Sequence, residues 1–311
     1  MFKLFKTRNF SDIFNDTFGF IKITGKNYFK NYVLVNSPFL LVLIVLGYFT
    51  GKVFFDAALS GFGTAGSQRI IEDFFSNNLT FFITSIIGIG LLFIIIAMIN
   101  YSYPVIYMRL YEDNNEPTTT QIVQELKKSI SKIILFALLW FISFLPVFIL
   151  VGFVCVFLFV LIIGIPFAFI ILAAVFSWMT LSFYHYLNSG EGYFTSFGKG
   201  LTIVSSKFWT HAGSTVIFAI IIYIVQLVIS LIPHIFGMAS IFTDTEGQTQ
   251  EEVLSFMGIV ALITFIITTI SNYVLGNLIY INQGMIYYSY REENENHSAK
   301  SEIDLIGSDS E

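Results

Sequence analysis

The sequence predicts an all-α, polytopic membrane protein with six transmembrane helices, three cytoplasmic interfacial amphipathic helices and a parallel threefold repeat. Three observations support this fold class. Hydrophobic residues make up 55% of the 311 residues and charged residues only 12%, whereas an average soluble domain is about 25% charged. Apolar runs of about 20 residues, the length that crosses a hydrocarbon core, recur along the chain. Basic residues gather in alternate loops, as in multi-pass proteins.

Six apolar runs have the length of membrane spans. In chain order they cover residues 33–51, 79–99, 133–159, 166–186, 214–231 and 253–280. The third and fourth runs belong to one stretch without Lys, Arg, Asp or Glu, which only the turn sequence at 164–166 interrupts. We therefore expect a tight helical hairpin there. The segment before the first run lacks a small-residue cleavage site, so we expect it to be retained.

Charge distribution predicts the orientation. Of the 16 Lys and Arg residues, Lys52 and Arg69 lie in one set of loops, and the other fourteen lie in the N-terminal segment, the alternate loops and the tail. Because cytoplasmic loops are rich in Lys and Arg, both termini are predicted to lie in the cytoplasm, with the chain in a bacterial inner membrane. Residues 1–290 form the predicted membrane domain, and the acidic residues 291–311 form a predicted disordered tail.

An amphipathic stretch precedes each odd-numbered span. In the second stretch, Thr118 and Gln121 have capping-box spacing. Each stretch ends in a lysine, and we expect each to lie in the headgroup layer and to bend into its span at that lysine. The resulting pattern of helix, bend and two spans predicts parallel repeats over about 10–110, 118–187 and 194–290. The apolar positions are Phe10, Ile13, Phe14, Thr17, Phe18 and Ile21, then Ile122, Leu126, Ile130 and Ile133, then Phe194, Phe197, Leu201, Val204 and Phe208.

Five residues near these bends are candidate contacts with lipid or with a partner: Lys26, Tyr28, Lys132, Lys207 and Trp209. If the repeat gathers the three lysines into a ring, the ring would attract anionic headgroups or an acidic partner. The alternative is that they only anchor the spans. The expected partners are membrane lipids, through anionic headgroups at the cytoplasmic face, and a membrane protein. We expect no nucleic-acid partner.

The stretch SFGKGLTIVSSKFWTHAGSTVIF, residues 196–218, resembles the bacterial membrane domain of the glycerophosphoryl diester phosphodiesterase type and related six-span inner-membrane families. The opening segment also resembles membrane proteins of Bacteroidota. The resemblance implies a six-span fold. It implies no catalysis, because the phosphodiesterase chemistry belongs to a separate soluble barrel of about 250 residues, for which this chain has no room.

A polar stripe on the last span is the most regular polar feature. It consists of residues four positions apart: Thr264, Thr268, Asn272, Gly276 and Tyr280. One interpretation is helix packing, in which small and hydroxyl residues permit close approach and each interhelical hydrogen bond adds about 0.6 kcal/mol. The other is the lining of a polar passage, although a passage for charged solutes would be expected to include an ionisable residue. Residues that could pack against such a stripe are Ala173, Ser177 and Thr180, with a small-residue pair at Gly47 and Gly51.

Motifs of the common enzyme classes are missing from the sequence: it contains no phosphate-binding loop, nucleophile elbow or paired zinc ligands. Cys155 is the only cysteine, so no intramolecular disulfide forms. We expect a non-enzyme without catalytic, cofactor or metal sites, either a membrane scaffold or a lipid-associated accessory component. The alternative is a transporter or channel subunit for a neutral or amphipathic solute. A lipid-active site built from loop residues such as Asp56, Glu72, Asp73 and Asn78 also stays open.

Overall fold

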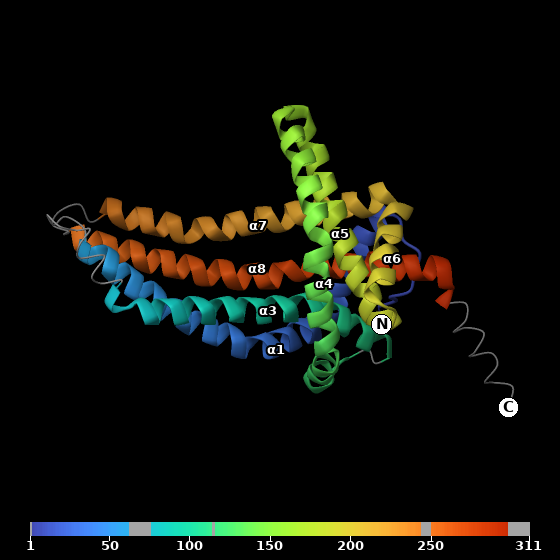
Figure 1. The fold of residues 1–311 in the computed structure, drawn as a ribbon, viewed down its shortest axis with the longest axis horizontal. Helices are drawn as coiled ribbons and strands as arrows, with labels where there is room; N and C mark the ends of the chain where they lie inside the picture. The colour runs from blue at the N-terminus through green and yellow to red at the C-terminus, as the bar shows by residue number, and fades with distance from the viewer. Residues whose placement is uncertain (1, 62–75, 114–115, 244–249, 298–311) are drawn as a thin grey trace. The chain divides into compact units, whose positions relative to one another are not determined.

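The computed structural model describes residues 2–61, 76–113, 116–243 and 250–297, and every regular element in these ranges is a helix (Figure 1). In chain order the elements are α1 (Phe10–Gly61), α3 (Leu79–Asp113), α4 (Thr119–Val160), the 3-10 helix η1 (Ile162–Gly164), α5 (Ile165–Ser189), α6 (Tyr193–Ser206), α7 (Phe208–Thr243) and α8 (Gln250–Glu295). The predicted all-α class is confirmed.

The chain divides into two compact units, which we call unit 1 and unit 2. Unit 1 consists of Met1–Val35, Asn100–Ile222 and Gly276–Glu311, and unit 2 of Asn36–Ile99 and Tyr223–Leu275. Helices α1, α3, α7 and α8 contribute a segment to each unit, whereas α4, α5 and α6 belong to unit 1 alone. This division follows contacts within each unit rather than the three sequence repeats, which stay a prediction.

Six helical segments are long and apolar enough to cross a membrane. They are Phe10–Val53, Leu79–Asp113, Thr119–Val160, Ile162–Ser189, Phe208–Pro233 and Gly258–Glu295. Large apolar side chains on them are exposed, for example Phe153 at 75% and Ile163 at 86%. Water would oppose such exposure, whereas hydrocarbon removes the penalty. The chain is therefore a multi-pass membrane protein, as predicted.

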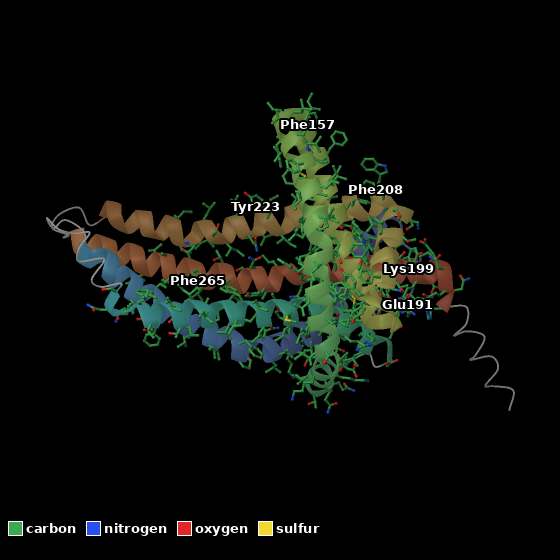
Figure 2. All side chains as sticks on the ribbon, viewed as in Figure 1. Phe157, Glu191, Lys199, Phe208, Tyr223 and Phe265 are labelled. Carbon is green, nitrogen blue, oxygen red and sulfur yellow. The ribbon has the colours of Figure 1, made fainter. Side chains whose placement is uncertain are left out.

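Helices α4 and α5 form the predicted hairpin in unit 1. Helix α4 ends at Val160, η1 makes the turn, and α5 begins at Ile165 with Pro166 in its first turn, a position where proline loses no hydrogen bond. A Cβ at Gly164 would collide with the carbonyl oxygen of Leu158, so only glycine fits the turn. Phe157 lies close to this turn, and side chains stand out around the hairpin (Figure 2).

The expected bends occur at only one of the three lysines. Helix α1 continues past Lys26 and α4 continues past Lys132, so these two amphipathic stretches are parts of the long helices rather than separate interfacial helices. The third stretch is the separate helix α6, and Lys207 breaks it from α7 with φ −138° and ψ 59°.

Two serines lie directly before the bend at Lys207. Ser205 and Ser206 close α6, and their hydroxyls donate to the carbonyls of Leu201 and Ile203 at 2.8 Å. Serine side chains that bond to the backbone in this way compete with helix propagation. Thr24, two residues before Lys26, makes the same kind of bond to the Phe20 carbonyl at 2.8 Å, yet α1 continues past Lys26, so hydroxyl bonds alone do not set the bend.

The predicted capping box starts α4. The hydroxyl of Thr118 accepts from the Gln121 backbone N–H at 3.3 Å, and the Gln121 side chain accepts from the Thr118 backbone N–H at 2.8 Å. Asn31 of α1 binds this start from the other side, because its Nδ2 donates to the Pro117 carbonyl at 2.9 Å. The Thr119 hydroxyl donates to Asn31 Oδ1 at 2.5 Å. These bonds fix where α4 begins against α1.

Tyrosines form the centre of unit 1. Tyr103 and Tyr107 lie one turn apart on α3 and face α1, where the Tyr28 ring lies 5.0 Å and 4.7 Å from theirs. The Tyr28 hydroxyl donates to Asn277 Oδ1 of α8 at 2.6 Å, and the Tyr103 hydroxyl donates to the Tyr28 carbonyl at 2.6 Å. Buried Tyr hydroxyls with partners combine a large apolar contact with a directional bond. They join α1, α3 and α8.

In unit 2, two glycines of α1 pack against α8. Gly47 and Gly51 of α1 face α8, where a Cβ on either glycine would press on Phe265 or Leu262. This is the small-residue pair expected from the sequence, and it lets two helices approach closely in lipid. Figure 2 marks Phe265 on α8.

Helix α8 extends into the predicted tail. It continues to Glu295, and Arg291 Nε donates to Glu295 Oε2 at 3.0 Å while its guanidinium lies 5.1 Å from the Phe5 ring centre. These contacts anchor the first residues of the segment that the sequence assigned to the tail. Residues 298–311 lie outside the described residues, and the tail prediction falls mostly on them.

Candidate functional site

The five predicted interfacial residues have different surroundings. Lys26 and Lys132 are exposed, and Trp209 is 67% exposed, as headgroup contacts would be. Lys207 forms an ion pair with Glu293. Tyr28 does not face the interface, because it is fully buried in the tyrosine centre of unit 1. The aromatic residue beside Lys26 therefore stabilises the fold rather than anchoring the chain to lipid.

Lys26 belongs to a row of three lysines on α1, which we call the lysine stripe: Lys22, Lys26 and Lys30. Four-residue steps place them on one helix face about 6 Å apart. All three are exposed, and no acidic side chain in the described ranges pairs with them. Ile23, beside the stripe, is 57% exposed, and Val33, at the start of the first apolar run, is 52% exposed. The spacing was visible in the sequence, although only Lys26 was singled out there.

A polar groove lies between α7 and α8 of unit 2. It has a volume of about 270 Å³ and is lined by Tyr223, Gln226, Leu227, Ile229 and Ser230 of α7 and by Thr268, Ser271 and Asn272 of α8. Gln226 Nε2 donates to Asn272 Oδ1 at 2.6 Å across it. Figure 2 shows Tyr223 on α7. The groove combines neutral polar groups with apolar walls inside two membrane-spanning segments.

The predicted polar stripe of the last span is split between the two units. Thr268 and Asn272 line the groove, and the Thr264 hydroxyl donates to its own helix at the Val260 carbonyl, 2.8 Å away. Gly276 and Tyr280 belong to unit 1, where the Tyr280 carbonyl accepts from a tyrosine hydroxyl of α5. Sequence reasoning missed the α7 side of the groove. The one available signal was Gln226, an amide in the middle of the fifth apolar run.

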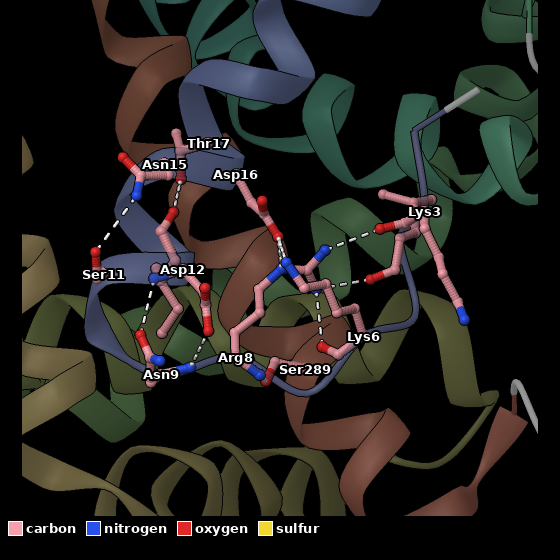
Figure 3. A network of polar contacts seen from close by, with 12 residues as sticks. Lys3, Lys6, Arg8, Asn9, Ser11, Asp12, Asn15, Asp16, Thr17 and Ser289 are labelled. Atoms are coloured by element: carbon pink, nitrogen blue, oxygen red, sulfur yellow. Dashed lines mark hydrogen bonds and ion pairs between the residues drawn. The ribbon is translucent and has the colours of Figure 1, made fainter.

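Arg8 forms a polar cluster that the sequence did not predict (Figure 3). Its side chain is fully buried, Nε donates to Asp16 Oδ2 at 2.8 Å, and the two terminal nitrogens donate to the carbonyls of Leu4 at 2.7 Å and Lys3 at 2.9 Å. Its backbone N–H donates to the Ser289 hydroxyl at 2.9 Å. Burial lowers the pKa of Arg8, Asp16 opposes that effect, and the guanidinium stays charged. The cluster attaches the N-terminal segment to α1 and α8.

A second buried polar network lies where α5, α7 and α8 meet in unit 1. Gln283 Nε2 donates to the Thr215 hydroxyl at 2.8 Å, and Asn282 Nδ2 donates to the Ser214 hydroxyl at 2.7 Å. Ser177 shares a 2.8 Å hydrogen bond with Thr215. Ser177 was expected to face the stripe of α8, and instead its hydroxyl bonds to α7. Such partnered groups hold helices together in lipid.

The described histidines have contrasting surroundings. His185 faces Glu191 at 3.0 Å. His211 is buried in unit 1, where its Nδ1 lies 2.8 Å from the Ile203 carbonyl and ties α7 to α6. In the part of the chain that the structure describes, His, Cys, Asp and Glu side chains form no group of three with metal-site geometry. The side chains of His234, Asp56, Glu72 and Asp73 lie outside the described residues, so the loop-based lipid-active site stays untested.

Helical architecture and apolar exposure together define the class: an all-α, multi-pass membrane protein. Comparison with protein-family models, with curated proteins and with solved structures gives no match. The resemblance to phosphodiesterase-type membrane domains therefore stays a prediction. Inferences about activity depend on the lysine stripe and the groove.

Proposed function

We propose that this protein is a non-catalytic membrane scaffold or lipid-associated accessory component that gathers anionic lipid at the cytoplasmic face of a bacterial inner membrane. The lysine stripe on α1 is the observation that carries the proposal. Lys22, Lys26 and Lys30 are exposed on one face, and carboxylates of the described residues do not neutralise them. Exposed apolar side chains follow directly, at Val33 and Leu34.

The position and the charge of the lysine stripe both match the lipid headgroup layer. The apolar run that starts at Val33 belongs in hydrocarbon, so the stripe one to three turns earlier lies at the depth of lipid phosphates. Each lysine near an anionic surface contributes about 1 kcal/mol of attraction. Three together provide roughly 3 kcal/mol, which salt weakens because the Debye length is about 10 Å at 0.1 M.

Replacing the stripe tests this proposal. The variant K22Q/K26Q/K30Q should fold, since these side chains are exposed, yet co-purify with several-fold less anionic lipid, measured by mass spectrometry of the bound lipids. The matched control is K6Q/K128Q/K207Q, which removes the same charge from lysines already paired with Asp16, Glu125 and Glu293. Equal lipid loss in both variants, or none in the stripe variant, would reject a lipid-gathering stripe.

The cytoplasmic placement of the stripe is part of the proposal and follows from the distribution of Lys and Arg. In a Cys155→Ala background, a cysteine introduced at Ser76 should react with an impermeant thiol reagent added outside intact spheroplasts. One introduced at Lys127 should react only after the membrane is opened. The reverse pattern would place the stripe on the outer face and contradict the proposal.

A transporter or channel subunit for a neutral or amphipathic solute is the second candidate. The polar groove between α7 and α8 favours it, because neutral hydrogen-bonding groups inside apolar spans suit an uncharged solute. Proteoliposomes loaded with such solutes distinguish the two functions. A scaffold gives no protein-dependent flux, whereas a transporter gives a flux that changes when Gln226 or Asn272 is replaced.

A further inference from the structure

We propose that the groove between α7 and α8 of unit 2 binds the uncharged polar head of a lipid, with the hydroxyl and ester groups found in a diacylglycerol. This inference goes beyond the lysine stripe and does not depend on it. The stripe belongs to unit 1 and attracts negative charge, whereas the groove belongs to unit 2 and has a neutral lining.

The groove opens among apolar side chains of membrane-spanning segments. Gln226 lies within the segment Phe208–Pro233 and Asn272 within Gly258–Glu295. Leu227 and Val228, next to Gln226, are exposed, as lipid-facing residues are. In hydrocarbon no water is present to satisfy an amide, so each free polar atom there is strongly unfavourable. The groove therefore favours a ligand that brings hydrogen-bonding groups.

The two amides leave hydrogen-bonding capacity unused. A side-chain amide offers two N–H donors and a carbonyl acceptor. The bond from Gln226 Nε2 to Asn272 Oδ1 uses one donor and one acceptor. No residue in the described ranges bonds to Gln226 Oε1 or Asn272 Nδ2. A lipid hydroxyl can donate to the first, and an ester carbonyl can accept from the second.

The charge of the groove lining and the volume of the groove indicate which class of ligand can bind. Among the described residues, no Asp, Glu, Lys, Arg or His lines the groove, so a phosphate or ammonium head would lose its hydration without gaining an opposite charge there. The groove volume of about 270 Å³ is far above the roughly 10–15 Å³ that a single water needs. That space accommodates a glycerol ester head, with the acyl chains leaving into the bilayer past Leu227 and Ile229.

A short lining also argues against a partner helix. On α7 the lining residues in the described part of the helix extend from Tyr223 to Ser230, about two turns or roughly 10 Å. A transmembrane helix would need a seam along most of about 20 residues. One compact head group matches the polar part of the groove better than a helix does.

A photoreactive lipid identifies the occupant. The full chain is reconstituted in nanodiscs containing a diazirine-labelled diacylglycerol or, in parallel, a diazirine-labelled phosphatidylglycerol. We expect the diacylglycerol to label residues 223–230 and 268–272, and excess unlabelled dioleoylglycerol to reduce this labelling. Phosphatidylglycerol should label the groove much less. Equal labelling by the two probes, or labelling that dioleoylglycerol does not reduce, would overturn the proposal.

Single substitutions in the groove test whether its two amides contact the lipid head. Q226L and N272L should each weaken labelling about fivefold, the effect of one net hydrogen bond. T84L is the matched control, because Thr84 is an exposed residue of unit 2 whose hydroxyl donates to its own helix. Unchanged labelling in N272L, or a cross-link from the groove to a second protein chain in place of lipid, would contradict lipid binding. Either result leaves the anionic-lipid test of the lysine stripe unaffected.

Discussion

Unit 1 buries its polar side chains between helices, whereas unit 2 places two amides in a groove. In unit 1, Tyr28, Asn277 and Gln283 are buried and bond to neighbouring helices, so their polarity is used to hold the fold. In unit 2, Gln226 and Asn272 line a groove and bond mainly to each other. A membrane protein gains little from burying apolar surface, since lipid is also apolar. Partnered polar groups therefore hold helices together here. Unit 1 also buries atoms without a partner, such as Gln283 Oε1 and Asn100 Nδ2, so the candidate ligand site of unit 2 rests on the groove that opens beside its two amides.

The largest expected effect concerns Arg8 in unit 1. Arg8→Gln removes the donors to three carbonyls and one of the two cations that pair with Asp16. Breaking a buried ion pair on one side costs up to about 3 kcal/mol, and Lys6 compensates part of that cost. We expect a clear fall in the thermal unfolding midpoint in detergent. Arg8→Lys should recover only part of the loss, because an ammonium cannot reproduce the fork of the guanidinium. A midpoint equal to that of the unmodified protein would show that the cluster does not hold the N-terminal segment.

A smaller effect is expected at the tyrosine centre. Tyr28→Phe removes the hydroxyl that donates to Asn277 Oδ1 at 2.6 Å and keeps the ring. The loss of one buried hydrogen bond costs about 1.5 kcal/mol. The unfolding midpoint should fall by less than in Arg8→Gln, and anionic lipid content should not change. A change in lipid content with no change in stability would restore Tyr28 as an interfacial contact.

The smallest effect is expected at Lys207. Its ion pair with Glu293 is partly exposed, and such pairs contribute about 0.5 kcal/mol or less. Lys207→Gln should leave both the unfolding midpoint and the bound anionic lipid almost unchanged. A loss of lipid as large as that from the lysine stripe would instead support the ring of Lys26, Lys132 and Lys207.

Local patterns predicted the fold more completely than the site. Apolar runs, the capping box at Thr118 and the turn at Gly164 depend on residues close in sequence, and the structure confirms them. The prediction of bends at Lys26 and Lys132 was wrong, because the residues that follow each lysine continue the helix. In α1, Tyr28 also packs inward and bonds to Asn277 of α8. This contact joins segments far apart in the chain, so local sequence did not indicate it.

Only one side of the groove was predictable. The four-residue period of α8 showed that Thr268 and Asn272 share a helix face. Helical periodicity describes one helix at a time, however, so it did not indicate that Gln226 and Ser230 of α7 lie opposite. Pairing between helices depends on tertiary packing, which a single sequence does not display.

One paired measurement tests the contrast between the units most directly. Tyr28→Phe and Asn272→Leu each remove one polar group, and both variants are assayed for the unfolding midpoint and for labelling by the photoreactive diacylglycerol. We predict that Tyr28→Phe lowers stability and keeps the labelling, whereas Asn272→Leu loses most of the labelling and lowers stability by less than Tyr28→Phe, because it gives up one partly exposed bond to Gln226. If Asn272→Leu destabilises the protein as Tyr28→Phe does and leaves labelling intact, the groove is a packing interface and the account is wrong.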